Sequence, residues 1–353
     1  MYALSPVCID SFEVKLLEQR RWLPALASAA GMLALILDSR TALSSATEGV
    51  ALCIKTIIPS LFPFIFLSGT FSGSCSGHAP GFLGRLPGIP RGMESLLIPA
   101  LLGGYPIGAQ CTYEAYRSHG ISKRQAERML AYCSNVGPAF IFGILPASFG
   151  GVRPAWAIWA IQLFSIWTAV LVFAPPWEEA PPPKKPQVSF GMEQAVGAML
   201  KICGWVILFR VLIGFLARWF LWGVSPVLQT LLSGFLELTN GCCRLDKIID
   251  GRIRFCVCNV LLAFGGICIL YQTHSVCPGL RLRFYCQGKL LQAATAGIVA
   301  AALCYGIWWL IPAWATGLFG VKAIEKRVEI PGRVVYNRGR NRWRADNAVS
   351  QKN

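Results

Sequence analysis

The uncharged run at residues 95–113 limits most strongly what this chain can fold into. Its middle, residues 99–110, reads Pro-Ala-Leu-Leu-Gly-Gly-Tyr-Pro-Ile-Gly-Ala-Gln, so two prolines and three glycines lie in an apolar segment. Proline removes a backbone donor, and glycine lets the chain leave helical geometry. In hydrocarbon, interrupted backbone is tolerated only against protein or a polar cavity. The run therefore predicts a broken membrane helix, an element that binds the substrate or ion in many transporters.

The same arrangement recurs later in the chain. In both copies a Gly-Gly pair is followed after five residues by a glutamine: Gly103-Gly104 with Gln110, and Gly265-Gly266 with Gln272. Upstream, residues 56–63 resemble residues 230–237 in the same order. We interpret this order as an internal duplication. The alternative is that the glycines only allow close helix packing.

Composition identifies a polytopic membrane protein. Of the 353 residues 54% are hydrophobic and only 14% are charged, and the mean hydropathy is +0.51. Soluble domains carry about 25% charged residues. We predict an all-α fold of about six to eight spanning or re-entrant helices, given ~20 residues per span, arranged as an inverted-topology repeat with broken helices. The net charge of +16 fits basic cytoplasmic loops better than nucleic-acid binding.

Neither a metal site nor an enzyme active site is evident. The 14 cysteines contain no C-x-x-C pair and the chain has three histidines, so we predict no metal, no cofactor and no disulfide framework. Many cysteines lie in apolar runs, where a free thiol behaves as a small hydrophobe. No Ser-His-Asp set, H-E-x-x-H, P-loop or paired carboxylates occur, and we expect no enzymatic activity.

The chain divides into five expected regions. An N-terminal segment with an uncleaved first transmembrane helix (1–49) precedes a first half (50–174). A proline-rich linker (175–189) separates it from a second half (190–316). A basic tail (317–353) is expected in the cytoplasm, against anionic lipid.

Segments with several charges are predicted to lie outside the membrane core. These are a loop with a short surface helix capped by Ser122 (114–128), an amphipathic surface segment (190–201), and loops at 244–254 and 281–289. Spans are expected at 155–174, 202–222 and 290–321. For residues 56–84, one helix with a proline kink and a re-entrant hairpin both remain open.

Polar residues inside the apolar segments are the candidate site. Asn135 lies beside Gly-Pro, and Glu237 precedes Leu-Thr-Asn-Gly; such groups need partners or water at membrane depth. Amide side chains supply donors and acceptors that suit a small polar solute. The predicted substrate-binding set is Gly103, Gly104, Tyr105, Pro106, Gly108, Gln110, Ser134, Asn135, Glu237, Thr239, Asn240, Gly265, Gly266 and Gln272.

Two of these residues keep an alternative interpretation. Asn135 either lines a ligand cavity or hydrogen-bonds a neighbouring helix as structural support. Glu237 either binds a coupling cation or proton, or neutralises Arg210 within the membrane.

Several of these motifs together resemble the YlbJ family of sporulation integral membrane proteins. The resemblance rests on Ile-Pro-Ser-Leu-Phe-Pro-Phe (58–64), Gly-Tyr-Pro-Ile-Gly-Ala-Gln (104–110) and Cys-Ser-Asn-Val-Gly-Pro (133–138), with a looser likeness at 237–241 and 265–272. It covers roughly residues 50–315. The resemblance implies a role in endospore formation and a transporter-like body of the nucleoside recognition (gate) domain group. Cys268 and the bulk before Gln272 depart from the family pattern.

These observations leave two functions open. The first is a carrier in the bacterial cell membrane that binds a small polar solute or a coupling ion. The second is a non-transporting scaffold that organises sporulation proteins through its loops and tail. The lipid bilayer is an expected partner and nucleic acid is not; a monomer and a homo-oligomer both remain open.

Overall fold

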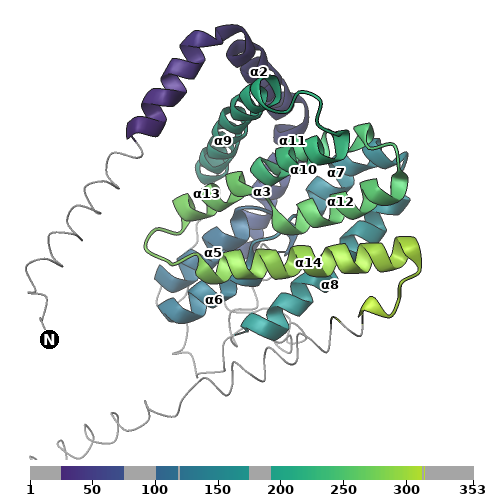
Figure 1. Ribbon diagram of the computed structural model, residues 1–353. Helices are drawn as coiled ribbons and strands as arrows, with labels where there is room; N and C mark the ends of the chain where they lie inside the picture. Colours follow the sequence, from purple (N-terminus) through teal and green to yellow (C-terminus); the bar gives the residue numbers. More distant parts are fainter. Residues whose placement is uncertain (1–24, 75–100, 118–119, 175–191, 312–313, 315–353) are drawn as a thin grey trace, which may run out of the picture. The chain divides into compact units, whose positions relative to one another are not determined.

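The computed structural model describes residues 25–74, 101–117, 120–174, 192–311 and 314, which are helical with no strand among them. Within these residues six helical segments are long and apolar enough to cross a membrane: Ser39–Leu67, Lys123–Phe149, Arg153–Phe173, Ala195–Trp219, Gly251–Val276 and Arg283–Tyr305. Two shorter apolar helices are Ala25–Leu37 and Pro226–Leu236. The predicted all-helical membrane fold is confirmed in this part of the chain. The chain divides into two units, Met1–Ala300 and Ala301–Asn353, and the description below concerns the first (Figure 1).

The first described span stays helical through its prolines. Helix α2 (Ser39–Leu52) continues through a π-helical turn (Cys53–Ile57) into α3 (Ile58–Ser74), which contains Pro63. Inserted π turns and prolines are the usual causes of a helix kink. The kinked-helix interpretation therefore holds up to Ser74, and residues 75–84 lie outside the described part.

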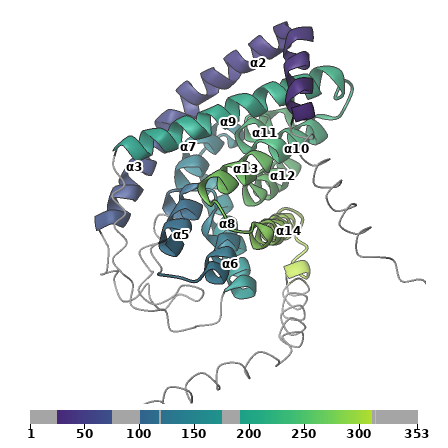
Figure 2. The ribbon, with the colours of Figure 1, turned by 90° about the vertical axis from the view of Figure 1, so that its left-hand side faces the viewer.

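Helix α9 (Met192–Trp219) runs beside α2 and corrects two expectations (Figure 2). It is one continuous helix, so the described part of the expected surface segment, residues 192–201, belongs to the same helix as 202–219. Arg210 pairs with Glu48 of α2, not with Glu237. Close packing explains the pairing, because a Cβ added at Gly49 would lie 3.1 Å from the Cα of Ile207 on α9.

The described residues between 101 and 174 form four helices. These are α5 (Ile107–Arg117), α6 (Lys123–Cys133), α7 (Pro138–Phe149) and α8 (Arg153–Phe173). Ser122 caps α6 as predicted, through a capping box with Gln125. The rest of the prediction for 114–128, a loop with a surface helix, is wrong for the described residues. Residues 114–117 belong to α5, and α6 is mostly buried, with Arg128 donating to the Phe173 carbonyl at 3.1 Å. Helix α8 matches the predicted plain span.

The second half repeats the use of short helices. In order they are α10 (Pro226–Leu236), α11 (Leu238–Cys242), η4 (Leu245–Lys247), α12 (Gly251–Phe264), α13 (Ile267–Val276) and α14 (Arg283–Tyr305). Two predicted loops are therefore too long. Residues 251–254 belong to α12, and residues 283–289 belong to α14, which ends at 305 instead of 321.

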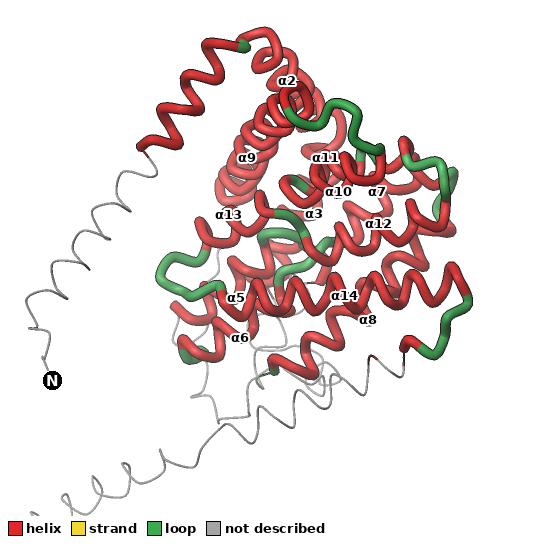
Figure 3. The backbone as a smooth tube through the Cα atoms, in the orientation of Figure 1, coloured by secondary structure: helices red, strands yellow, loops and turns green. Residues whose placement is uncertain are grey.

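Four short breaks interrupt runs that are apolar in the sequence; Figure 3 colours loops green and helices red. They lie at residues 103–106 before α5, at 134–137 between α6 and α7, at Glu237 between α10 and α11, and at 265–266 between α12 and α13. Gly104, Gly265 and Gly266 have φ of +73°, +86° and +92°, a region that side chains with a Cβ rarely adopt. Both Gly-Gly copies are thus broken, as predicted.

The interruptions cross one another in pairs. A Cβ added at Gly137 would lie 2.9 Å from the Leu102 carbonyl oxygen and 3.0 Å from the Gly104 Cα. Likewise, a Cβ at Gly266 would lie 2.9 Å from the carbonyl oxygen of Gly234, near the end of α10. Each half therefore brings two broken segments into backbone contact, which only glycine permits.

Gly137→Ala is expected to destabilise the protein by about 1–3 kcal/mol, because the new methyl group overlaps backbone that cannot move away. Gly204→Ala in α9 is the matched control, since a Cβ there meets nothing within 4 Å. The measurement is the apparent thermal unfolding midpoint of both variants in one detergent. Equal midpoints would show that the crossing is looser than described.

Candidate functional site

A lysine lies buried in a membrane-spanning helix. Lys289 of α14 is 2% exposed, and its Nζ donates to Asn135 Oδ1 at 2.9 Å, Tyr105 Oη at 3.1 Å and Gln292 Oε1 at 3.2 Å. An ammonium group carries three N–H bonds, so each finds one acceptor. Among the described ion pairs none includes Lys289. Its three acceptors in the described part of the chain are therefore neutral oxygens.

The same side chains complete the broken end of α6. Where a helix stops, its last carbonyl groups lack partners, and this costs free energy away from water. Asn135 Nδ2 donates to the Tyr132 carbonyl, and Gln292 Nε2 donates to the Ala131 carbonyl at 2.7 Å. Gly288 makes this possible, because α14 presses directly on the Ala131 backbone and leaves no room for a Cβ.

Tyr105 connects this cluster to the second half. Its hydroxyl donates to the Leu262 carbonyl, 3.3 Å away in the last turn of α12. Its ring lies against Gly265, where an added Cβ would be 2.9 Å from Tyr105 Oη. The end of a helix carries partial negative charge. The ammonium of Lys289 thus sits near the C-terminal ends of two interrupted helices, α6 and α12.

Glu237 lies at the N-terminal end of a helix, whereas Lys289 lies near C-terminal ends. It is 2% exposed and caps α11, accepting from the backbone N–H groups of Thr239 at 3.0 Å and Asn240 at 2.7 Å, and from Asn240 Nδ2 at 2.7 Å. Carboxylates are favoured at helix N-termini for the same electrostatic reason. Glu237 and Lys289 are therefore each paired with helix ends and not with each other.

A small inner cavity of about 40 Å³ lies at the interruptions. Its lining includes Gly104, Tyr105, Gly137, Glu237 and Gln272. Such a volume admits water but no metabolite. Most of its lining is apolar, with Tyr105, Glu237, Thr239 and Gln272 as the polar side chains, so it is a small and mainly apolar space where the broken helices meet.

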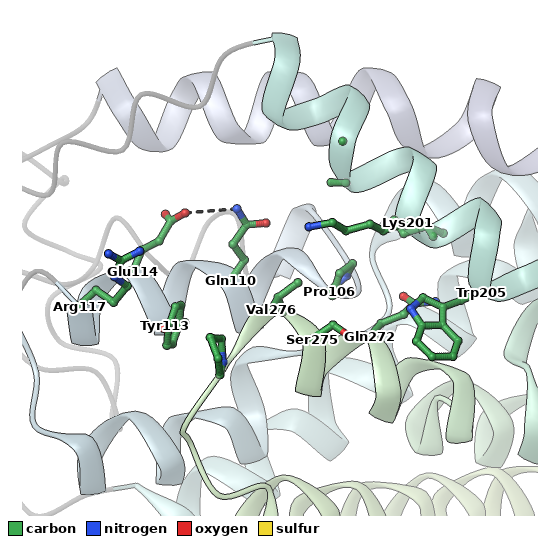
Figure 4. A pocket seen from close by; sticks show the side chains of 14 residues that line it. Pro106, Gln110, Tyr113, Glu114, Arg117, Lys201, Trp205, Gln272, Ser275 and Val276 are labelled. Atoms are coloured by element: carbon green, nitrogen blue, oxygen red, sulfur yellow. Dashed lines mark hydrogen bonds between the residues drawn. The ribbon is translucent and has the colours of Figure 1, made fainter. Parts of the chain in front are cut away.

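A larger outer pocket of about 390 Å³ adjoins it, and Gln272 and Ile202 line both spaces. This volume falls within the range of ligand sites. In Figure 4, Lys201 reaches from α9 toward Gln110 of α5, while Trp205 and Gln272 lie at the other end of the pocket. Three helices from both halves, α5, α9 and α13, therefore supply the walls.

Charge in the outer pocket is mixed. Arg117 and Lys201 face one carboxyl group, Glu114, which accepts from Gln110 Nε2 at 3.2 Å. Burial raises the pKa of Glu114, and the hydrogen bond from Gln110 and the charge of Arg117 oppose that rise. A group that carries both an acceptor and a donor fits this lining.

The structure brings together part of the predicted site. Five predicted residues line the inner cavity: Gly104, Tyr105, Glu237, Thr239 and Gln272. Pro106, Gln110 and again Gln272 line the outer pocket. The others line neither space: Gly103, Gly108, Ser134, Asn135, Asn240, Gly265 and Gly266. Asn135 and Asn240 instead hydrogen-bond Lys289 and Glu237, which favours the supporting role for Asn135.

The sequence pattern does not identify Lys289 as part of the site, because a charged residue beside an apolar run indicates the end of a loop. A usable signal was present, since Lys289, Gln292 and Thr295 follow at helical spacing and all three are buried. Lys201 and Glu114 were missed for the same reason: both were assigned to surface segments, and both line the outer pocket.

No metal cluster is seen in the described part of the chain: no three His, Cys, Asp or Glu side chains there are placed to hold an ion. The described cysteines are free thiols, and most are buried.

One comparison with known proteins bears on this architecture. The chain is 28% identical over 109 residues to the sporulation integral membrane protein YlbJ of Bacillus subtilis (strain 168). The match covers 29% of this chain and only 26% of that protein. No family model matches the chain, and no solved structure does. The chain is thus a multi-span membrane protein distantly related to a sporulation membrane protein.

Asn135→Leu is expected to cost about 1.5–3 kcal/mol because the ammonium of Lys289 loses an acceptor. In a Lys289→Met background that part of the cost disappears, so the two substitutions should show a coupling energy of the same size. Asn259→Leu is the matched control: Asn259 is also a buried amide, bonded to Gln162 and to the Phe255 carbonyl. Its cost should be the same in both backgrounds, as measured by unfolding in detergent.

Glu114 gives a pH prediction. Because its pKa is raised in the folded protein, the folded state binds the proton more tightly than the unfolded state, so stability falls as pH rises from the unfolded to the folded pKa. Glu114→Gln should remove this fall and keep an acceptor for Gln110. Unfolding midpoints across the acidic range check this. An identical pH profile in both proteins would place Glu114 in an aqueous setting.

Proposed function

We propose that this chain is a membrane carrier that binds a small polar solute in the outer pocket. One observation carries the proposal: Gln272, on the half-helix that follows the second Gly-Gly pair, lines both the pocket and the inner cavity, opposite Gln110 on the half-helix that follows the first. Solute sites at the meeting point of discontinuous helices are typical of secondary transporters.

The chemistry of the lining supports a polar solute. Gln110 and Gln272 offer amide donors and acceptors, Lys201 offers a cation, and Trp205 offers an aromatic face, itself stacked on Tyr271 with ring centroids 5.6 Å apart. Nucleosides and amino acids present matching groups. We interpret the two halves as gate-like units of an inverted repeat, in which the broken segments form the body of the carrier.

The relationship to YlbJ supports a place in endospore formation. That protein is a sporulation integral membrane protein by name, and the likeness extends over 109 residues. We infer that the carrier works in a membrane of the sporulating cell. A scaffold role is the alternative, and it depends on the basic tail at 317–353, which lies outside the described residues.

Binding of a solute is expected to depend on Gln272. The probes are uridine, adenosine, glutamine and succinate, tested by thermal shift and by uptake into proteoliposomes. Gln272→Ala should weaken binding about tenfold, the effect of one hydrogen bond of 1.4 kcal/mol. Gln287→Ala, an exposed glutamine on α14, is the control and should bind like the parent.

Equal affinities in Gln272→Ala and the parent protein would exclude the outer pocket as the site. If no probe binds, and deletion of residues 321–353 impairs sporulation more than substitution of Gly104 or Gly266, the scaffold function replaces the carrier.

A further inference from the structure

The ammonium of Lys289 lies near the C-terminal ends of two interrupted helices, α6 and α12. Carriers with broken helices coordinate a free ion with the carbonyl ends of half-helices. Here the ammonium lies beside the capped ends of α6 and α12, and a covalent side chain supplies the charge. Unlike a free ion, the ammonium of Lys289 is covalently attached and cannot dissociate. Only the proton on Nζ can be bound and released there.

We propose that Lys289 is a proton-binding site, and that gain or loss of its proton switches the hydrogen bond made by Tyr105. In the charged state the three N–H bonds of Nζ meet Asn135, Tyr105 and Gln292. In the neutral state Nζ has two N–H bonds and one lone pair, so one of the three partners must become a donor.

Only Tyr105 can make that change. The amide of Asn135 is fixed because its Nδ2 donates to the Tyr132 carbonyl, and the amide of Gln292 is fixed because its Nε2 donates to the Ala131 carbonyl. Both therefore present oxygen to Lys289. The Tyr105 hydroxyl is free to rotate, and it donates to Nζ by giving up the Leu262 carbonyl.

Protonation is in this way linked to the contact between the two halves. Loss of a proton from Nζ to solvent moves the Tyr105 hydroxyl away from α12, whose last turn then has an unpaired carbonyl next to Gly265. Tyr105 also lines the inner cavity, and so does Glu237. The meaning of this link for transport rests on the proposed function; the proton site itself does not.

The surroundings contain other groups that titrate. Tyr105 and Tyr285 face Lys289 with ring centroids 4.9 Å and 5.9 Å from Nζ, and the Cys133 thiol of α6 interacts with it electrostatically. Glu237 lines the inner cavity together with Tyr105, and its described hydrogen bonds go to Thr239 and Asn240 of α11. A buried ammonium has lost its hydration, and neutral oxygens replace only part of that free energy. Both protonation states are therefore accessible.

The test is a pH series of 15Nζ-lysine NMR spectra of the full-length protein in lipid nanodiscs without solute. The Lys289 resonance is identified by its absence from Lys289→Met and from Lys289→Arg, so one misfolded variant does not prevent assignment. A single-proton transition of this resonance within the pH range of the folded protein is expected. A constant chemical shift across that range would overturn the proposal.

Two variants test the switch. Tyr105→Phe should move the midpoint to lower pH by about one unit, since hydrogen bonds to a charged group are stronger than those to a neutral one. Tyr285→Phe and Lys201→Met are controls and should leave it unchanged. An unmoved midpoint in Tyr105→Phe would remove the switch. A titrating Lys289 together with the scaffold outcome given above (no probe bound, and a stronger sporulation defect from tail deletion) would refute the carrier alone. Probe binding with a non-titrating Lys289 would refute the proton site alone.

Discussion

The structure depends on pairing the peptide groups that interrupted helices expose. Away from water each unpaired carbonyl or N–H costs free energy, so a break survives only if another group reaches it. Here the ends of α6 are reached by Asn135 and Gln292, the end of α12 by Tyr105, and the start of α11 by Glu237. Every one of these side chains comes from a broken segment or from α14. The polar side chains of the candidate site are therefore the same ones that pair the peptide groups at the helix breaks.

Charge follows the same logic. A helix end carries about half an elementary charge, positive at the start and negative at the finish. The cation Lys289 lies near the C-terminal ends of α6 and α12, and the anion Glu237 lies at the N-terminal end of α11. Each charge is therefore stabilised by helix ends, without an ion pair between the two side chains. In a direct buried pair each charge depends on the other, because the loss of one partner leaves the other charge buried and uncompensated. Separated charges leave both groups able to respond to water, protons or a solute.

Sequence patterns predicted the breaks well because glycine and proline act locally. Gly104, Gly265 and Gly266 adopt the backbone that only glycine accepts readily, and this follows from the chain without knowledge of its neighbours. Partners were not predictable in the same way. Arg210 pairs with Glu48 because α2 packs against α9. Lys289 is buried because Gly288 allows α14 to pack closely against α6. Such contacts depend on tertiary packing, which the sequence pattern does not reveal. The charges of these residues alone indicate loops.

The contact at Gly288 also restricts how such a protein can move. Helix α6 belongs to the first half and α14 to the second, yet their backbones touch where a single methyl group would not fit. Helices interlocked so closely neither slide nor tilt against each other without separating. The two halves therefore do not rock as independent bodies about this seam. Any relative movement of α6 and α14 must therefore leave the contact between Gly288 and Ala131 in place or separate the two helices there.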